Sequence, residues 1–146
     1  MFLGSVPETI CVRRVMKEIT KIMVYEWNMK QFDWLGYRTS KNNPYTYHHA
    51  FIPRRYGGRE TIENGAILCG NSSHPYIHVI ESRDIDRYAY LTSILKEINE
   101  QHYMPTKDQL QKIRSCLESF EKEYSGARTK KGKVLIKEAY TRREYR

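Results

Sequence analysis

Residues 45–78 read YTYHHAFIPRRYGGRETIENGAILCGNSSHPYIH. This stretch holds four of the five histidines of the 146-residue chain, arranged on either side of Asn64. A catalytic metal centre needs two or three fixed ligands, and the water that it uses needs a base that is neutral near pH 7. Imidazoles can do both, so the stretch contains the residue types of a metal centre.

The adjacent pair His48-His49 lies in residues 45–52, which are rich in β-forming side chains and end before Pro53. This composition predicts a strand. Neighbouring side chains of a strand point to opposite faces, so the two imidazoles are expected to have different tasks. One would face a metal ion and the other a substrate phosphate.

Residues 61–69 contain an Asn-Gly pair followed by apolar residues, which favours a hairpin with Asn64 opposite His49. Residues 70–73 have capping chemistry, and Pro75 suits the first position of a helix. In that helix His74 and His78 share one face, so both rings can point at one ion.

Residues 54–60 are predicted to form a turn between the two strands. Its basic side chains, Arg54, Arg55 and Arg59, could hold a phosphate or could simply be solvated. Glu63 and Glu81 could accept a hydrogen bond from an imidazole, or they could be ordinary surface carboxylates.

The order of strand, Gly-containing turn, strand and helix, with His-His, Asn and His-x-x-x-His at those points, resembles the HNH (His-Me finger) endonuclease family. The helical His pair is similar to that of colicin-type bacterial DNases. The string YHH, GG and ENGAIL is similar to phage-borne HNH proteins. The resemblance covers residues 44–81, about a quarter of the chain.

The resemblance implies an α+β fold with a small ββα-metal core, about residues 44–82, and flanking helices. It implies an endonuclease that hydrolyses phosphodiester bonds in DNA by nicking or double-strand cutting. His49 would be the general base and Asn64 would orient its ring. His48 and His78, joined by His74, would bind one divalent ion.

The chain departs from the family in its cysteines and in its ligand set. Many members carry Cys-x-x-Cys pairs around a structural zinc, whereas Cys11, Cys69 and Cys116 lie far apart, so no structural zinc is expected. Many members have Asp where His48 stands, and oxygen ligands suit Mg²⁺. Imidazoles suit transition metals better. The identity of the ion therefore stays open, with Mg, Mn, Ni and Zn as candidates.

The length predicts one globular domain, residues 1–125, followed by a basic tail, residues 126–146. The tail carries eight Lys or Arg against two Glu, so it holds +6 of the net charge of +8. It is expected either to attract a polyanion through Arg128, Lys130, Lys131 and Lys133 or only to solubilise the chain.

Helices are predicted over residues 7–26, 84–101 and 106–124, with an irregular cover over residues 30–43. The aromatic residues near that cover could pack or could stack on bases. No apolar run approaches the ~20 residues of a membrane span, and no signal segment is evident, so a cytoplasmic protein with reduced thiols is expected.

The expected partner is DNA, with RNA, a homodimer or a larger phage or mobile-element complex left open and no membrane partner. Little sequence specificity is expected, because the predicted helices show no row of Arg, Asn or Gln suited to base edges. Two alternatives remain: a non-catalytic nucleic-acid-binding protein that keeps the His-Me scaffold, and a regulator with a structural zinc. Neither alternative needs a histidine at position 49, so the presence of His49 favours a catalytic function.

Overall fold

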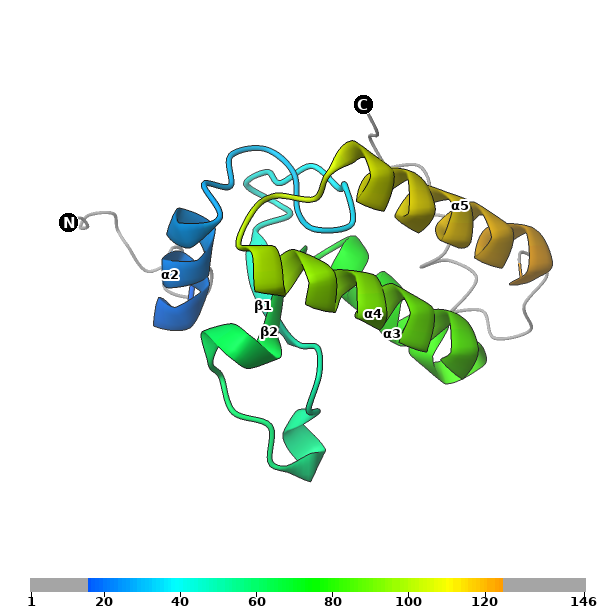
Figure 1. Ribbon diagram of the computed structural model, residues 1–146, viewed down its shortest axis with the longest axis horizontal. Helices are drawn as coiled ribbons and strands as arrows, with labels where there is room; N and C mark the ends of the chain where they lie inside the picture. Colours follow the sequence, from blue (N-terminus) through cyan, green and yellow to red (C-terminus); the bar gives the residue numbers. More distant parts are fainter. Residues whose placement is uncertain (1–15, 125–146) are drawn as a thin grey trace.

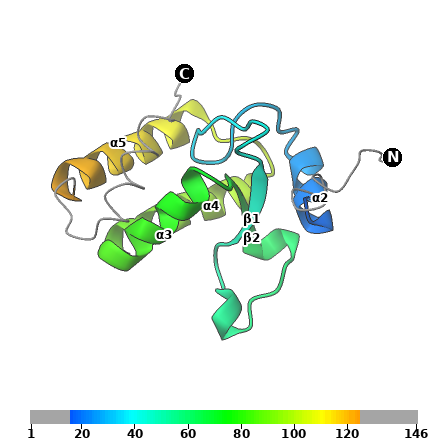
Figure 2. The ribbon, with the colours of Figure 1, turned by 180° about the vertical axis from the view of Figure 1, so that it is seen from behind.

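A computed structural model describes residues 16–124 (Figures 1 and 2). In this part of the chain the fold is mixed, with four α-helices and one two-stranded antiparallel sheet, which confirms the expected α+β class at this level. The elements are α2 (Glu18–Glu26), β1 (Tyr45–His49), β2 (Gly65–Cys69), α3 (Ser73–Arg83), α4 (Ile85–Gln101) and α5 (Lys107–Tyr124). Residues 7–15 of the predicted first helix and the basic tail lie outside the described residues.

The sheet is shorter than predicted, and its register differs by one residue. Strand β1 ends at His49, which pairs with Gly65, so Asn64 lies across from Ala50 and accepts a hydrogen bond from its backbone N–H at 3.0 Å. Gly65 is needed here because a Cβ would lie 2.2 Å from the Tyr47 ring. Gly65 therefore begins β2 directly after Asn64, and the Asn-Gly pair does not form a tight hairpin turn.

The two strands are joined by residues 50–64, which project away from the sheet in both views (Figures 1 and 2). We call these residues the connecting loop. It contains two 3₁₀ turns, Arg54–Tyr56 at its far end and Ile62–Asn64 where it returns to β2. The turn predicted for residues 54–60 therefore occurs, inside a longer connection.

Helix α3 begins at Ser73, two residues before Pro75, because a buried carboxylate holds its first turn. Asp33 is fully buried, accepts the backbone N–H of Cys69 at 2.7 Å and accepts the Ser73 hydroxyl. The Ser73 Oγ also accepts from the Cys69 N–H at 3.0 Å. Burial raises the pKa of Asp33. Pro75 still lies in the first turn, where a helix does not need its N–H.

Helices α4 and α5 occur where the sequence predicts them. Helix α4 is capped by Asp84, which accepts the Arg87 backbone N–H at 3.1 Å. Helix α5 opens with a capping box: the Gln109 N–H donates to the Thr106 Oγ1 at 3.1 Å, and the Thr106 N–H donates to the Gln109 Oε1 at 2.9 Å. No helix among the described residues is long and apolar enough to cross a membrane.

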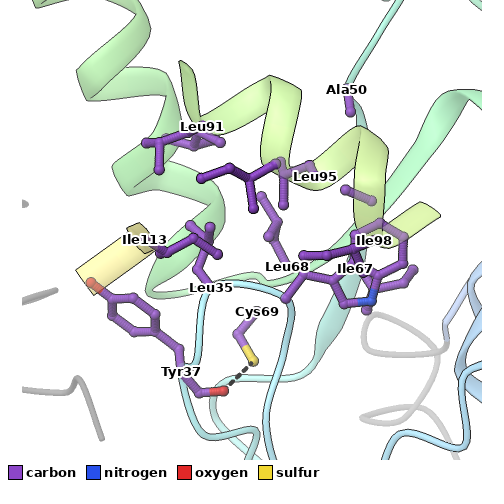
Figure 3. Close-up of a cluster of buried hydrophobic side chains, with 14 of the residues drawn as sticks. Leu35, Tyr37, Ala50, Ile67, Leu68, Cys69, Leu91, Leu95, Ile98 and Ile113 are labelled. Carbon is purple, nitrogen blue, oxygen red and sulfur yellow. Dashed lines mark hydrogen bonds between the residues drawn. The ribbon is translucent and has the colours of Figure 1, made fainter. Parts of the chain in front are cut away.

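The core lies between the sheet, the helices and the segment that precedes β1 (Figure 3). Leu91, Leu95 and Ile98 of α4 face it at helical spacing, next to Ile67 and Leu68 of β2. Residues 30–43 cover the sheet as expected, with the Trp34 backbone N–H donating to the Ile67 carbonyl at 3.2 Å. Trp27, Trp34 and Tyr37 are buried, so these rings pack in the core and are not exposed for base stacking.

Candidate metal centre

Three imidazoles meet where β1 faces α3. His48 comes from β1, and His74 and His78 come from successive turns of α3. Each pair of ring centroids is 5.2 Å apart, and one nitrogen of each ring lies within 4.8 Å of the other two. This spacing lets the three residues share one metal ion, as the helical spacing of His74 and His78 predicted.

His48 is the buried member of the group. Its Nε2 is shielded from solvent and has no hydrogen-bond partner among the described residues. Burial, together with the neighbouring His74 and His78, holds the pKa of His48 well below its ordinary value, so the ring is neutral at pH 7. A buried polar atom without a partner costs about 1–3 kcal/mol, and a metal ion would satisfy this nitrogen.

The tautomer of His74 follows from its neighbour Thr46. The Thr46 hydroxyl donates its single hydrogen to the Leu68 carbonyl at 2.6 Å, and its oxygen lies 2.8 Å from the His74 Nδ1. Nδ1 must therefore carry the proton, which leaves Nε2 with a free lone pair. Burial lowers the pKa of His74 to about 4, with His78 and His49 contributing, so this ring is also neutral.

His78 is oriented by a carboxylate on its own helix. The His78 Nδ1 lies 3.0 Å from the Glu81 Oε1, and the donor must be the imidazole N–H because an ionised carboxylate only accepts. This again leaves Nε2 for an ion. A carboxylate behind a histidine ligand fixes the ring and increases its basicity, an arrangement typical of metal sites in proteins.

His49 lines the same cleft from the other side of the strand. The cleft has a volume of about 460 Å³ and is lined by Tyr47, His48, His49, Pro53, Arg54, Arg55, His74, His78, Glu81 and Tyr88. The His49 ring packs edge-on against Tyr47 and is not part of the three-imidazole group. The two adjacent histidines therefore occupy different positions, as strand alternation predicted.

The electrostatic surroundings keep His49 neutral. Partial burial lowers its pKa, Glu60 opposes this, and Lys17 and Arg54 add to the lowering. The Glu60 Oε2 lies 3.9 Å from the His49 Nε2 and 2.6 Å from the Lys17 Nζ. A neutral imidazole in the same cleft as the three-imidazole group can accept a proton at pH 7.

Asn64 has a different hydrogen-bonding role from the expected one. Its Oδ1 accepts the Ile52 backbone N–H at 2.7 Å, and its Nδ2 donates to the Ile52 and Arg59 carbonyls, each at 3.0 Å. None of its hydrogen bonds reaches the His49 ring. Asn64 fixes the base of the connecting loop, so it acts on the backbone that follows His49.

The basic residues predicted to bind phosphate are placed unequally. Arg54 and Arg55 line the cleft, whereas Arg59 does not and contributes its carbonyl to the Asn64 contacts. The four basic tail residues, Arg128, Lys130, Lys131 and Lys133, lie outside the described residues. A phosphate near the three imidazoles would therefore meet Arg54 and Arg55 first.

Two residues of the site, Thr46 and Glu60, were not identified from the sequence, which also left the role of Glu81 undecided. Thr46 lies two residues before His48, so strand alternation places both on one face and could have identified it. Glu60 had no such signal, because the path of the connecting loop brings it to His49. Of the two open carboxylates, Glu81 contacts an imidazole, and no such contact occurs for Glu63 among the described residues.

Comparison of the chain with protein-family models, curated proteins and solved structures gives no significant match.

Proposed function

We propose that the chain is a metal-dependent HNH endonuclease that hydrolyses phosphodiester bonds in DNA, with β1, β2 and α3 as its ββα-metal core. One observation carries the proposal: three histidine rings lie within ligand distance of one another while His49 lies in the same cleft. The contacts of Thr46 with the His74 Nδ1 and of Glu81 with the His78 Nδ1 support the proposal, since they leave the Nε2 of both rings available to a metal ion.

The openness of the site favours catalysis over a structural zinc. Structural zinc sites are closed by four protein ligands, whereas catalytic sites have three and keep a position for water or substrate. Among the described residues the group has three histidines, and the His78 side chain is 52% exposed. Two arginines next to it suit a phosphate, which a closed structural site would not need.

The proposed reaction is an in-line displacement at phosphorus. His49 accepts a proton from a water molecule as the water oxygen attacks phosphorus, and the bond from phosphorus to the 3′ oxygen breaks. The leaving oxygen takes a proton from solvent, so the products are a 5′-phosphate and a 3′-hydroxyl. A divalent ion held by His48, His74 and His78 would stabilise the negative charge that develops on the phosphate.

Arg54 and Arg55 would position the phosphate, and Asn64 would hold the loop that carries them. The His49 proton is returned to solvent after each turnover, for which a ring that is neutral at pH 7 is well suited. The phosphate contacts carry no base information, so cleavage is expected to show little sequence preference.

The test is nicking of supercoiled plasmid by the full chain, with EDTA or with added Mg²⁺, Mn²⁺, Ni²⁺ or Zn²⁺. The wild type should nick only with a metal, and His48→Ala should not nick. His102→Asn is the matched control, because it removes the fifth histidine, outside the cleft, and Asn tolerates the left-handed backbone at this position (φ 56°).

Nicking by the His48→Ala variant, or in EDTA, would refute the proposed site. Tight DNA binding by the wild type without cleavage under any of the four metals would favour the non-catalytic nucleic-acid-binding protein. Metal-dependent folding without DNA binding would favour the regulator with a structural zinc.

A further inference from the structure

The connecting loop carries an exposed aromatic ring at its far end. Tyr56 belongs to the 3₁₀ turn Arg54–Tyr56 and is 71% exposed. This turn is the part of the loop that lies farthest from the sheet in Figure 1. Its neighbours Arg54 and Arg55 line the cleft that contains the histidines, and the Arg55 guanidinium lies over the Tyr56 ring.

The loop is held by hydrogen bonds at its base and across its turn, although it projects from the fold. Asn64 bonds the backbone of Ile52 and Arg59, and the Tyr47 hydroxyl donates to the Thr61 carbonyl at 2.7 Å and accepts the Thr61 N–H at 3.0 Å. Gly58 closes the turn, because its N–H donates to the Pro53 carbonyl at 3.0 Å and a Cβ there would lie 1.7 Å from the Ile52 oxygen. A contact made by the tip therefore does not require the loop to become ordered first.

The Tyr56 ring is itself held in place. The Arg55 guanidinium carbon lies 4.9 Å from its centroid, over the ring, while the side chain stays largely open to solvent. A largely exposed aromatic ring beside a cation is a suitable platform for a flat apolar group. Nucleobases are flat, and every base presents a π-face to such a platform.

Arg55 connects the Tyr56 ring to the three-imidazole group. Its guanidinium lies 3.7 Å from the Glu81 carboxylate, which orients His78. A strand whose phosphate lies between the histidines and Arg55 would place a neighbouring base at the loop tip. In an intact duplex that base is stacked between its neighbours, whereas in a single strand it is free to stack elsewhere.

We propose that Tyr56 stacks on an unpaired nucleobase next to the scissile phosphate, so that the preferred substrate is single-stranded or locally unpaired DNA. This inference rests on the proposed function, because it uses the position of the phosphate at the histidines. It also fits cleavage without sequence specificity, since stacking on an aromatic ring tolerates all four bases.

The test is DNA binding by the full chain in EDTA, so that no cleavage occurs. The probes are a fluorescein-labelled single-stranded oligonucleotide and the corresponding duplex, at matched ionic strength. Tyr56→Ala should weaken single-strand binding about tenfold and duplex binding much less. Tyr56→Phe keeps the ring and should bind as the wild type does. Tyr25→Ala is the matched control, since Tyr25 is 84% exposed on α2 and outside the cleft.

A second measurement reports the contact itself. An oligonucleotide with 2-aminopurine at successive positions should show quenching by the wild type and by Tyr56→Phe at one position, and that quenching should be lost with Tyr56→Ala. Equal binding by Tyr56→Ala and the wild type, equal losses on both probes, or no single-strand binding by the wild type would each overturn the inference.

The same data separate this inference from the proposed function. Tyr56-dependent single-strand binding without metal-dependent nicking would retain the stacking contact and reject the nuclease. Metal-dependent nicking with Tyr56→Ala binding like the wild type would do the reverse.

Discussion

At the scale of single residues, the candidate site consists of pairs in which one side chain sets the state of another. Thr46 fixes the tautomer of His74, and Glu81 fixes that of His78. For His49 the neighbouring Glu60 Oε2 lies 3.9 Å from Nε2, beyond hydrogen-bond distance, so it does not fix the tautomer of the ring. This difference separates residues suited to binding an ion from a residue suited to taking up a proton.

Replacing His49 with alanine should abolish cleavage and leave metal binding unchanged. The ring lies outside the three-imidazole group, and general-base catalysis contributes on the order of 10²- to 10⁴-fold. Plasmid nicking and titration calorimetry on the same preparation measure both quantities. A metal affinity that falls in step with activity would show that His49 is a ligand.

Replacing Glu81 with glutamine should weaken metal binding about 10- to 100-fold, because the amide orients the His78 ring less strongly than a carboxylate does. Glu63→Gln is the matched control, because Glu63 is exposed and contacts no imidazole among the described residues. Titration of both variants with Zn²⁺ and Ni²⁺ provides the comparison. Equal metal affinities of the Glu81→Gln and Glu63→Gln variants would show that Glu81 does not contribute to metal binding.

The low pKa values of His74 and His48 make the stability of the metal-free protein depend on pH. Between pH 6.5 and about 4 the unfolded chain binds a proton at His74 while the folded protein does not, and the lowered pKa of His48 acts in the same direction. The free energy of unfolding should therefore be highest above pH 6.5 and fall by ~1.4 kcal/mol per pH unit for each such histidine as the pH decreases.

Urea denaturation in EDTA at pH 7.5, 6.0 and 5.0 measures this dependence. The variant His74→Gln has one titrating group fewer, so its stability should fall less steeply. Identical slopes for the variant and the wild type would mean that His74 is not buried in its neutral form.

At the scale of elements, the connecting loop is the part that gives the cleft its second wall. Helix α3 and strand β1 carry the three-imidazole group, and the loop brings Arg54 and Arg55 to the same cleft. Its position depends on Asn64, which is buried and makes three hydrogen bonds to backbone atoms. Helix α4 supports the same region, since the Asn99 Nδ2 donates to the Ile62 and Gly65 carbonyls.

Replacing Asn64 with alanine should loosen the connecting loop and leave the three-imidazole group in place. Three backbone groups lose their partner, which should cost about 1–3 kcal/mol of stability and expose the Ile52 amide to hydrogen exchange. Nicking should slow while metal affinity stays unchanged. Asn42→Ala, at an exposed position, is the control. Unchanged protection of the Ile52 amide from hydrogen exchange would contradict the proposed role of Asn64 in holding the connecting loop.

At the scale of the whole molecule, positive charge is concentrated in two regions of the sequence. Arg54 and Arg55 lie at the cleft, and residues 126–146 carry most of the net charge. Cations that neutralise phosphates release counterions, so each contact makes DNA binding more sensitive to salt. We expect the two regions to contribute differently to DNA binding: Arg54 and Arg55 to position one phosphate, and residues 126–146 to raise the affinity for any stretch of DNA.

Deleting residues 126–146 should lower DNA affinity and flatten its dependence on salt concentration, while metal affinity stays the same. Fluorescence anisotropy at several salt concentrations, with circular dichroism to check folding, makes the measurement. Should affinity and slope survive the deletion, the phosphate contacts belong to Arg54, Arg55 and other residues of the folded part.

The sequence by itself determined the local features of this protein. Hydrophobic periodicity and capping residues located α4 and α5, and the i, i+4 spacing placed His74 and His78 on one helical face. Strand alternation separated His48 from His49. Each of these follows from repeat geometry within about ten residues, which the order of amino acids specifies directly.

The tertiary structure decided which groups meet across the fold. Asn64 bonds Ile52 and Arg59 because the loop is longer than a hairpin turn, and Glu60 reaches His49 by the same path. The start of α3 depends on Asp33, forty residues before Ser73 in the chain. Such contacts arise when buried polar groups must find partners, and only the packed chain determines which partners are within reach.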